Sequence, residues 1–241
     1  MIELRDVRKV YPDGHVALRG LSLRVEAAMT VAMLGPSGCG KTTTLKLVNR
    51  LLTPTSGCIL VNGRDVAAVD VIQLRRGIGY VVQDAGLFPH LTAEENVEVV
   101  PRLLGWPAAQ RQRRSAELFA LVGLDYAQHG PRYPAELSGG QRQRVGLARA
   151  LAADPPLVLM DEPFGALDPI TRRRLQREFL ELKGRLRKTV VLVTHDVEEA
   201  FLLADRVAVL ADGELVQFGT PDEIRAAPVS DFVASFFGVE R

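Results

Sequence analysis

GPSGCGKT, at residues 35–42, is the most informative stretch of this sequence. It matches G-x-x-x-x-G-K-[ST], the pattern of a phosphate-binding loop, and it stands between an apolar strand pattern and a helical pattern. Glycines there allow backbone N–H groups to turn inward, and the positive end of the helix dipole attracts phosphate. Lys41 would reach the terminal phosphates of a nucleotide, and the Thr42 hydroxyl would be a ligand of Mg²⁺. The alternative interpretation is a glycine turn with an incidental lysine.

The segments on either side of this loop predict an α/β domain. Thr30 to Leu34 is a short apolar strand, and the apolar pattern that begins at Lys41 indicates a helix. Three later segments are also short, apolar and bounded, as buried parallel strands are. They are Ile78 to Val82, Leu157 to Met160 and Val190 to Val193. We therefore expect a parallel sheet covered by helices.

The two ends of the chain show the patterns of antiparallel strands. Residues 2–10 and 17–25 read as strands separated by the turn-forming Tyr11-Pro12-Asp13-Gly14, which predicts an antiparallel sheet. Near the other end, Asp212-Gly213 lies between two apolar segments and predicts a hairpin. Between Leu91 and Ala127 the strand signal disappears and helical patterns replace it, so a helical subdomain is expected at about residues 88–152.

Composition limits the classes of function. The chain has 241 residues, 47% of them hydrophobic, and a formal charge of +1, so it lacks the basic field of a general nucleic-acid binder. No apolar run approaches the roughly 20 residues that span a bilayer, and the N-terminus lacks a signal-peptide core. A cytosolic, soluble protein is expected. Cys39 and Cys58 show no metal-ligand spacing and are expected to be reduced thiols.

Two carboxylates follow the apolar strand that ends at Met160. A phosphate loop needs an acid for its metal and a group that orients the attacking water. Asp161 would hold Mg²⁺ through its water shell, and Glu162 would orient or deprotonate the water. The alternative is a strand exit that ends in two solvated acids.

LSGGQ, at residues 137–141, precedes a helical pattern. Ser138 is a good N-cap, and the two glycines leave the N–H groups of the first turn uncovered, which makes a second anion-binding helix end. An ordinary capped helix is the alternative interpretation.

These motifs together resemble the nucleotide-binding subunit of an ATP-binding cassette (ABC) transporter, over essentially the whole chain and in the expected order. The resemblance implies a P-loop NTPase cassette, with a RecA-like parallel-sheet core, an N-terminal antiparallel β-subdomain and an α-helical signature subdomain. It implies that residues 1–241 form one ATP-binding domain without a C-terminal regulatory domain. ATP and Mg²⁺ are the implied cofactors.

The resemblance assigns roles residue by residue. The ATP-binding set begins with an aromatic that stacks on adenine and a residue packed near the same ring, and it continues through the phosphate loop. Its members are Tyr11, Val16, Gly35, Pro36, Ser37, Gly38, Cys39, Gly40, Lys41, Thr42 and Thr43. The implied catalytic residues are Glu162, His195 and Gln83, and the implied Mg²⁺ ligands are Thr42, Gln83 and Asp161. From the sequence alone, Tyr11 could equally be a strand-end tyrosine, Gln83 a surface glutamine and His195 a structural histidine.

The family packs two copies head-to-tail. Leu137, Ser138, Gly139, Gly140 and Gln141 would then contact, in trans, the nucleotide bound by the other copy, and Asp168 would lie near that interface. The remaining histidines, His15, His90 and His129, match no family position, and no chemistry is assigned to them.

The resemblance also implies partners. These are a second copy of the chain, transmembrane permease subunits and, indirectly, a substrate-binding protein, but no nucleic acid. The expected location is cytoplasmic, peripheral on the inner face of the cell membrane. Leu87 and Phe88 form an apolar step that would receive a short helix of the permease, or would be buried under the helical subdomain.

Residues 80–97, Pro101 and Trp106, together with residues 165–172, resemble the importers of osmoprotectants such as glycine betaine, carnitine and choline. The alternatives are an importer of another small solute, such as an amino acid, and a non-transport ABC ATPase switch. The basic run Arg172 to Arg174 shares a helical pattern with Leu175 and Phe179, which predicts a solvated helix face rather than a nucleic-acid contact.

Overall fold

The structure is a computed structural model that describes residues 2–83, 85–165 and 167–238. It divides the chain into two compact units. The first unit joins residues 2–75 to residues 188–238, and the second consists of residues 76–187. Asp84 and Ala166, which belong to stretches quoted for the family resemblance, lie outside the described residues.

An antiparallel sheet forms the N-terminal part of the first unit. Its strands, in the order β2-β1-β4-β5, are β2 (Val16–Val25), β1 (Ile2–Val10), β4 (Ser56–Val61) and β5 (Arg64–Asp65). Alternate side chains of β1, namely Ile2 and Leu4, are buried, as expected for a sheet with one face in a core. The antiparallel N-terminal sheet is therefore confirmed, and strands β4 and β5 are additions that the sequence patterns did not predict.

The same unit contains parallel strands. β3 (Thr30–Leu34) runs parallel to both β8 (Thr189–Val193) and β9 (Arg206–Ala211). β10 (Glu214–Gly219) pairs with β9 in an antiparallel hairpin. The two turn residues, Asp212 and Gly213, have φ values of 49° and 81°, as the two central residues of a type I′ turn require. The expected hairpin is confirmed.

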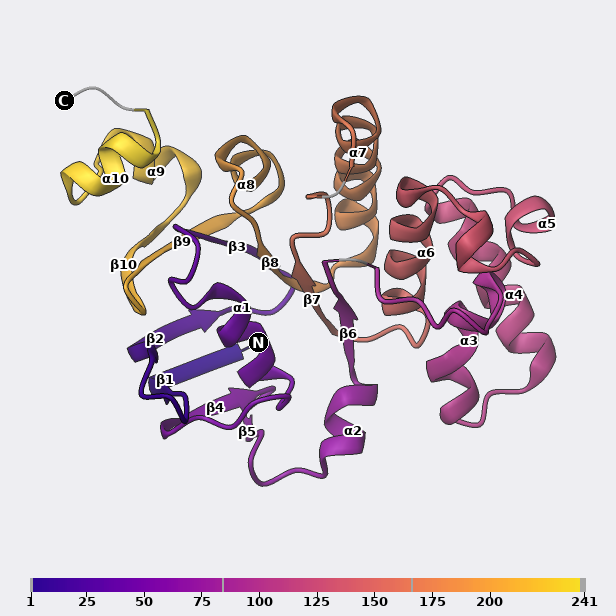
Figure 1. Ribbon diagram of the computed structural model, residues 1–241, viewed down its shortest axis with the longest axis horizontal. Coiled ribbons are helices and arrows are strands. Elements are labelled where there is room, and N and C mark those ends of the chain that lie inside the picture. The colour runs from indigo at the N-terminus through magenta and orange to yellow at the C-terminus, as the bar shows by residue number, and fades with distance from the viewer. Residues whose placement is uncertain (1, 84, 166, 239–241) are drawn as a thin grey trace. The chain divides into compact units, whose positions relative to one another are not determined.

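The first unit also contains helices. They are α1 (Lys41–Val48), α2 (Val71–Arg76), α8 (Val197–Leu203), α9 (Pro221–Ala226) and α10 (Asp231–Phe236), with the last residue of α2 opening the second unit. Figure 1 shows α8, α9 and α10 beside β9 and β10. One buried cluster joins β3 and β9 to these three helices, through residues such as Val207, Ala200, Ile224 and Val233. The buried cluster fixes the carboxyl ends of β3 and β9, from which the site is built.

The second unit contains a parallel strand pair and a group of helices. β6 (Ile78–Val81) and β7 (Leu157–Asp161) pair in parallel, and Val81 stands beside Met160. The helices are α3 (Ala93–Leu103), α4 (Ala108–Leu121), α5 (Tyr126–His129), the 3₁₀ turn η1 (Pro134–Glu136), α6 (Gly139–Leu151) and α7 (Pro169–Leu186). Helices α3, α4 and α6 pack against one another through buried side chains that include Val97, Phe119 and Val145. The helices expected after Leu91 are confirmed, whereas the subdomain boundary at residues 88–152 stays a prediction.

Together these elements confirm the expected α/β class with parallel strands and an antiparallel N-terminal sheet. Among the residues that the structure describes, no helix combines the length and the apolar character needed to cross a membrane.

Candidate functional site

The phosphate loop connects β3 to α1 in the first unit. Gly35 leaves the strand with a φ of 151°, and a Cβ at this position would lie 2.1 Å from the backbone oxygen of Leu210 in β9. Gly40, the N-cap of α1, has a φ of 102°, and a Cβ there would lie 2.6 Å from the backbone oxygen of Ala17. Only glycine fits both positions, because each combines a left-handed backbone with a neighbouring backbone atom. The glycine pattern of the sequence is therefore a requirement of this local packing.

Lys41 is the charged residue of the predicted loop, and its ammonium folds back over the loop backbone. Its Nζ donates hydrogen bonds to the backbone oxygens of Gly35, at 2.6 Å, and Pro36, at 2.9 Å. The side chain is 7% exposed, so the ammonium is largely withdrawn from water. A buried cation at a helix N-terminus that has no side-chain cap attracts an anion.

Cys39 lies inside the same loop. Its side chain is 3% exposed, and Sγ is 3.7 Å from the Lys41 Nζ. Burial raises the pKa of the Cys39 thiol, and the charge of Lys41 opposes that shift only in part. Cys39 is thus a neutral packing group at neutral pH, in agreement with the expected free thiol.

Tyr11 stands next to this loop. Its hydroxyl shares a hydrogen bond of 3.2 Å with the Thr43 hydroxyl, in the first turn of α1. The Tyr11 ring also lies nearly parallel to the His15 ring, with 6.2 Å between the centroids, and the Lys9 Nζ is 5.5 Å from its centre. Val16 is half-buried at the start of β2, paired with Val10. The ring that the resemblance assigns to adenine is therefore tied to the phosphate loop.

His195 occupies the same sheet edge as the loop. β3 and β8 are parallel neighbours, so the loop after β3 and the segment after β8 leave the sheet at one edge. Thr194 donates its N–H to the backbone oxygen of Met33, and its hydroxyl accepts the N–H of Asp196, which caps α8. These contacts present the His195 side chain to solvent at the phosphate-loop edge of the first unit.

The second unit brings together the two predicted groups at the ends of β6 and β7. The Nε2 of Gln83 donates a hydrogen bond of 3.2 Å to Oε2 of Glu162. Asp161, at the end of β7, is 7% exposed, and its charge adds to the effect of burial in raising the pKa of Tyr80 to about 12. A buried carboxylate, Asp161, and a half-buried one, Glu162, thus leave the same strand end.

Glu162 has a left-handed backbone, with a φ of 46°. A non-glycine residue in this region is strained, and such strain persists where the surroundings hold it. The Gly165 N–H donates to the backbone oxygen of Glu162, and the Arg172 guanidinium donates to the backbone oxygens of Phe164, Gly165 and Leu167. The expected solvated face is therefore wrong for Arg172, since its guanidinium closes the loop after Glu162, while Arg173 and Arg174 are exposed.

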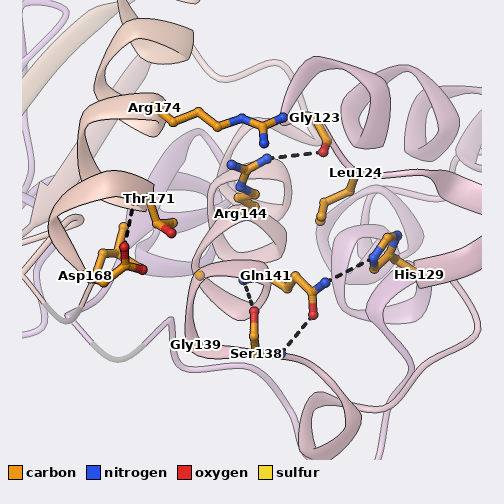
Figure 2. A pocket seen from close by; sticks show the side chains of 12 residues that line it. Gly123, Leu124, His129, Ser138, Gly139, Gln141, Arg144, Asp168, Thr171 and Arg174 are labelled. Atoms are coloured by element: carbon orange, nitrogen blue, oxygen red, sulfur yellow. Dashed lines mark hydrogen bonds between the residues drawn. The ribbon is translucent and has the colours of Figure 1, made fainter.

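The glycine-rich signature starts α6 (Figure 2). Ser138 and Gln141 form a reciprocal capping box: the Ser138 Oγ accepts the Gln141 N–H at 3.2 Å, and the Gln141 Oε1 accepts the Ser138 N–H at 2.8 Å. Ser138 and Gly139 are exposed, Gly140 and Gln141 are half-buried, and Leu137 is buried. The capped helix end is confirmed, and the exposed Ser138 and Gly139 leave it accessible to an anion.

This helix end opens into a cavity of about 450 Å³. Its lining includes residues 138–141 of the signature, together with His129, Arg144, Arg174 and Asp168. Asp168 caps α7 by accepting the N–H groups of Ile170 and Thr171, and the hydrogen bond with Thr171 lowers the pKa of its carboxyl. Figure 2 shows Asp168 and the signature residues Ser138, Gly139 and Gln141 around one cavity.

Sequence patterns missed His129 as a neighbour of this site. Its Nε2 shares a hydrogen bond of 3.2 Å with the Nε2 of Gln141, and its Nδ1 is 2.9 Å from the backbone oxygen of Asp125. A histidine 12 residues before Gln141 carries no local signal, because the contact depends on how α5 packs beside α6.

The donor atoms of the implied metal ligands suit Mg²⁺. Thr42, in the first turn of α1, offers a hydroxyl, Gln83 an amide oxygen and Asp161 a buried carboxylate, and all three are the hard oxygen donors that Mg²⁺ prefers. Over residues 2–83, 85–165 and 167–238, no group of three or more His, Cys, Asp and Glu side chains forms a metal cage. Mg²⁺ in nucleotide sites relies on one or two carboxylates together with phosphate oxygens, so the available groups fit it.

Comparison with known proteins agrees with this geometry. The family described as ABC transporter matches residues 18–165. The glycine betaine/carnitine/choline transport ATP-binding protein OpuCA of Bacillus subtilis (strain 168) is 53% identical over 241 residues, which are 100% of this chain and 63% of that protein. The osmoprotectant import ATP-binding protein OsmV of Salmonella typhimurium is 53% identical over 225 residues, 93% of this chain and 59% of that protein. The chain thus spans about six tenths of the length of these curated relatives.

A solved structure gives the same result for the fold. The dimeric structure of an ATP-binding cassette in a post-hydrolysis state, bound to ADP and Pi, is similar with a TM-score of 0.83 and 35% identity. The similarity covers 92% of this chain and 99% of that chain. Because the family match spans more than half of the sequence and the fold agrees over nearly all of a solved cassette, this chain belongs to the ABC transporter family.

Proposed function

We propose that this chain is the ATP-binding and ATP-hydrolysing subunit of an ABC importer. The observation that carries the proposal is the phosphate loop, in which Gly35 and Gly40 permit a close backbone turn and the buried Lys41 ammonium lies over it. A loop of this kind at a helix N-terminus is a receptor for the phosphates of a nucleotide. The sequence similarity to ATP-binding transport proteins supports the same assignment.

In this proposal each side chain has a defined task. Tyr11 stacks on the adenine, and Lys41 holds the β- and γ-phosphates. Glu162 accepts a proton from water while the water oxygen attacks the γ-phosphorus, and the bond from that phosphorus to the bridging oxygen breaks, so that ADP leaves with the electron pair. Gln83 orients the Glu162 carboxylate, and His195 contacts the γ-phosphate. Mg²⁺ bound by Thr42, Gln83 and Asp161 would neutralise charge on the phosphate oxygens.

The proposal includes a head-to-tail dimer with a second copy. The exposed end of α6 at Ser138 and Gly139 has the chemistry of an anion-binding helix end, and the first unit already contains another one in the phosphate loop. In the proposed dimer the signature of one copy contacts the nucleotide on the other copy. ATP then stabilises the closed dimer and hydrolysis removes that stabilisation. The similar solved cassette is dimeric, which supports the formation of a dimer.

We further propose that the imported solute is an osmoprotectant of the quaternary-amine class. The support comes from two relatives that are each 53% identical to this chain. One is a glycine betaine/carnitine/choline transport ATP-binding protein and the other is an osmoprotectant import ATP-binding protein. The solute would be handled by transmembrane permease subunits and a substrate-binding protein, with this chain bound to the permease at the inner face of the membrane. Transport of a different small solute, or a switch function without transport, would be separate outcomes of the test.

The test is uptake by the reconstituted complex of this chain with its genomic-neighbour permease and binding protein in proteoliposomes that contain ATP. We expect uptake of labelled glycine betaine, carnitine or choline, with no uptake of a labelled amino acid. Amino-acid uptake would overturn the solute assignment alone. Failure of the chain to bind any permease, with an ATPase rate unaffected by membrane components, would overturn the importer assignment.

A further inference from the structure

Arg149, near the end of helix α6, connects two parts of the second unit. Its Nη1 donates a hydrogen bond of 2.7 Å to the backbone oxygen of Gly86, and its Nη2 donates one of 2.7 Å to the backbone oxygen of Ala85. The guanidinium carbon also lies 5.9 Å from the centre of the Phe88 ring. One side chain of the signature helix thus holds the loop that follows β6.

That loop needs to be held, because its backbone is strained. Ala85 and Gly86 are consecutive residues in the left-handed region, with φ values of 58° and 54°. Such a conformation is unfavourable for alanine and persists only where neighbouring structure maintains it. Ala85 is 2% exposed, and its Cβ faces Gly146 of α6, where an added Cβ would lie 3.3 Å away. Helix α6 therefore both covers the strained turn and binds its carbonyl groups.

The same turn carries Gln83. The Ala85 N–H donates to the backbone oxygen of Val82 at 3.0 Å, so Gln83 lies within the turn that this hydrogen bond closes. The Gln83 amide reaches Glu162 at 3.2 Å. Beyond the turn, Asn96 of α3 accepts the Phe88 N–H at 2.7 Å and donates to the Phe88 carbonyl at 3.1 Å. With Arg149 at one end and Asn96 at the other, residues 85–88 are fixed to two helices.

We propose that Arg149 is a positioning residue that keeps the Gln83 amide against Glu162 by clamping the Ala85-Gly86 turn to helix α6. The proposal rests on the proposed function, since it assumes that Glu162 is the catalytic base. Arg149 itself lies on the backbone of the turn and acts on catalysis through Gln83. A guanidinium suits this task because its planar fork presents two N–H donors to two successive carbonyls, whereas an ammonium is a single point charge.

The chain offers a matched control. Arg114 of α4 also donates to two backbone oxygens of successive residues, those of Leu151 at 3.1 Å and Ala152 at 3.3 Å. These carbonyls belong to the last residue of α6 and to the residue after it, and they are not part of the turn that carries Gln83. Arg149→Met and Arg114→Met therefore remove the same kind of contact from two different places.

The first arm of the test measures amide hydrogen exchange of the whole chain, and it requires no activity. We expect Arg149→Met to accelerate exchange at residues 85–88 relative to the unsubstituted chain, while Arg114→Met leaves these amides unchanged. Arg149→Lys should give an intermediate result, and it keeps the test available if Arg149→Met fails to fold. If the amides of residues 85–88 exchange equally slowly with and without the Arg149 substitution, the proposal that Arg149 clamps this turn is wrong.

The second arm measures kcat and KM for ATP. We expect Arg149→Met to lower kcat by about tenfold with little change in KM, a loss typical of removing a group that orients a functional residue. Adding Arg149→Met to Gln83→Ala should then cause little further loss, because both changes remove the same orientation of Glu162. If the two losses multiply, Arg149 does not act through Gln83 and the proposal fails. An unsubstituted chain that hydrolyses no ATP contradicts the proposed function instead, and the exchange arm still decides the clamp.

Discussion

The side-chain amide of Gln83 donates a hydrogen bond of 3.2 Å to the carboxylate of Glu162, across 79 positions of sequence. The two residues follow β6 and β7, which are parallel neighbours, so one strand pair brings the amide to the carboxylate. Glu162 also holds a strained backbone with a φ of 46°. Strain that the surroundings maintain at a polar strand end is typical of a catalytic position, and it makes Glu162 the first residue to test.

Glu162→Gln keeps the shape of the side chain and removes its ability to accept a proton. We expect ATP binding to persist while turnover falls by about 10²-fold or more, because general-base catalysis is lost. Size-exclusion chromatography with ATP and Mg²⁺ should show an accumulated dimer. Glu198→Gln, at an exposed position in the first turn of α8, is the matched control and should leave turnover unchanged. Undiminished turnover in Glu162→Gln would contradict the assigned role.

Lys41→Met removes the ammonium that bonds the Gly35 and Pro36 carbonyls. We expect the Kd for ATP, measured by calorimetry, to rise by about tenfold or more, since a hydrogen bond to a charged group contributes roughly 1.5–3 kcal/mol. Lys46→Met, in the last turn of the same helix, should leave the Kd unchanged. An equal Kd in both variants would show that Lys41 does not bind phosphate.

Gly35→Ala tests whether the loop conformation requires glycine. The new Cβ would lie 2.1 Å from the Leu210 backbone oxygen, whereas nothing lies within 4 Å of a Cβ at Gly63, whose φ is +75°. Gly63→Ala should therefore cost only the backbone strain, about 1 kcal/mol, while Gly35→Ala adds an overlap of about 1–3 kcal/mol. Thermal unfolding should show a clearly lower Tm for Gly35→Ala, and equal Tm values would argue against the overlap.

Alkaline titration tests the surroundings of Asp161. Burial and the Asp161 charge raise the pKa of Tyr80 from 10.0 to about 12, so the folded protein favours the neutral phenol. This stabilisation is fully present below pH 10.0 and is lost as the pH rises through about 12. Ultraviolet absorbance should show one tyrosine component with a midpoint near 12 that disappears in Tyr80→Phe.

The same titration has a control in Asp161→Asn, which should lower the midpoint of that component because the repelling charge is gone. Stability measured by denaturant unfolding should fall less steeply above pH 10.0 in Tyr80→Phe than in the unsubstituted chain. A Tyr80 component that titrates at its ordinary pKa would mean that neither burial nor Asp161 acts on it.

Local patterns were sufficient for much of the fold. The strand before the phosphate loop, the α1 helix, the Asp212-Gly213 hairpin and the Ser138 cap all follow from residues within a few positions of one another. Strands β4 and β5 were not predicted. In β4 the apolar run Cys58 to Val61 was not recognised as a strand signal, whereas β5 has only two polar residues and is defined by its pairing with β4. Arg172 differs from its predicted solvated role because its guanidinium donates a hydrogen bond to the backbone oxygen of Phe164, in the loop that precedes its own helix.

The sequence by itself determined which chemical groups are available. They are a phosphate loop that requires glycine at positions 35 and 40, two carboxylates at the end of an apolar strand, and a glycine-rich helix start. These depend on short-range geometry, which residue type and spacing specify directly. Tertiary structure alone decided which groups meet, including Gln83 with Glu162, His129 with Gln141 and Arg149 with the Ala85-Gly86 turn. Such contacts join distant segments, so they depend on strand pairing and helix packing, and no local pattern encodes them.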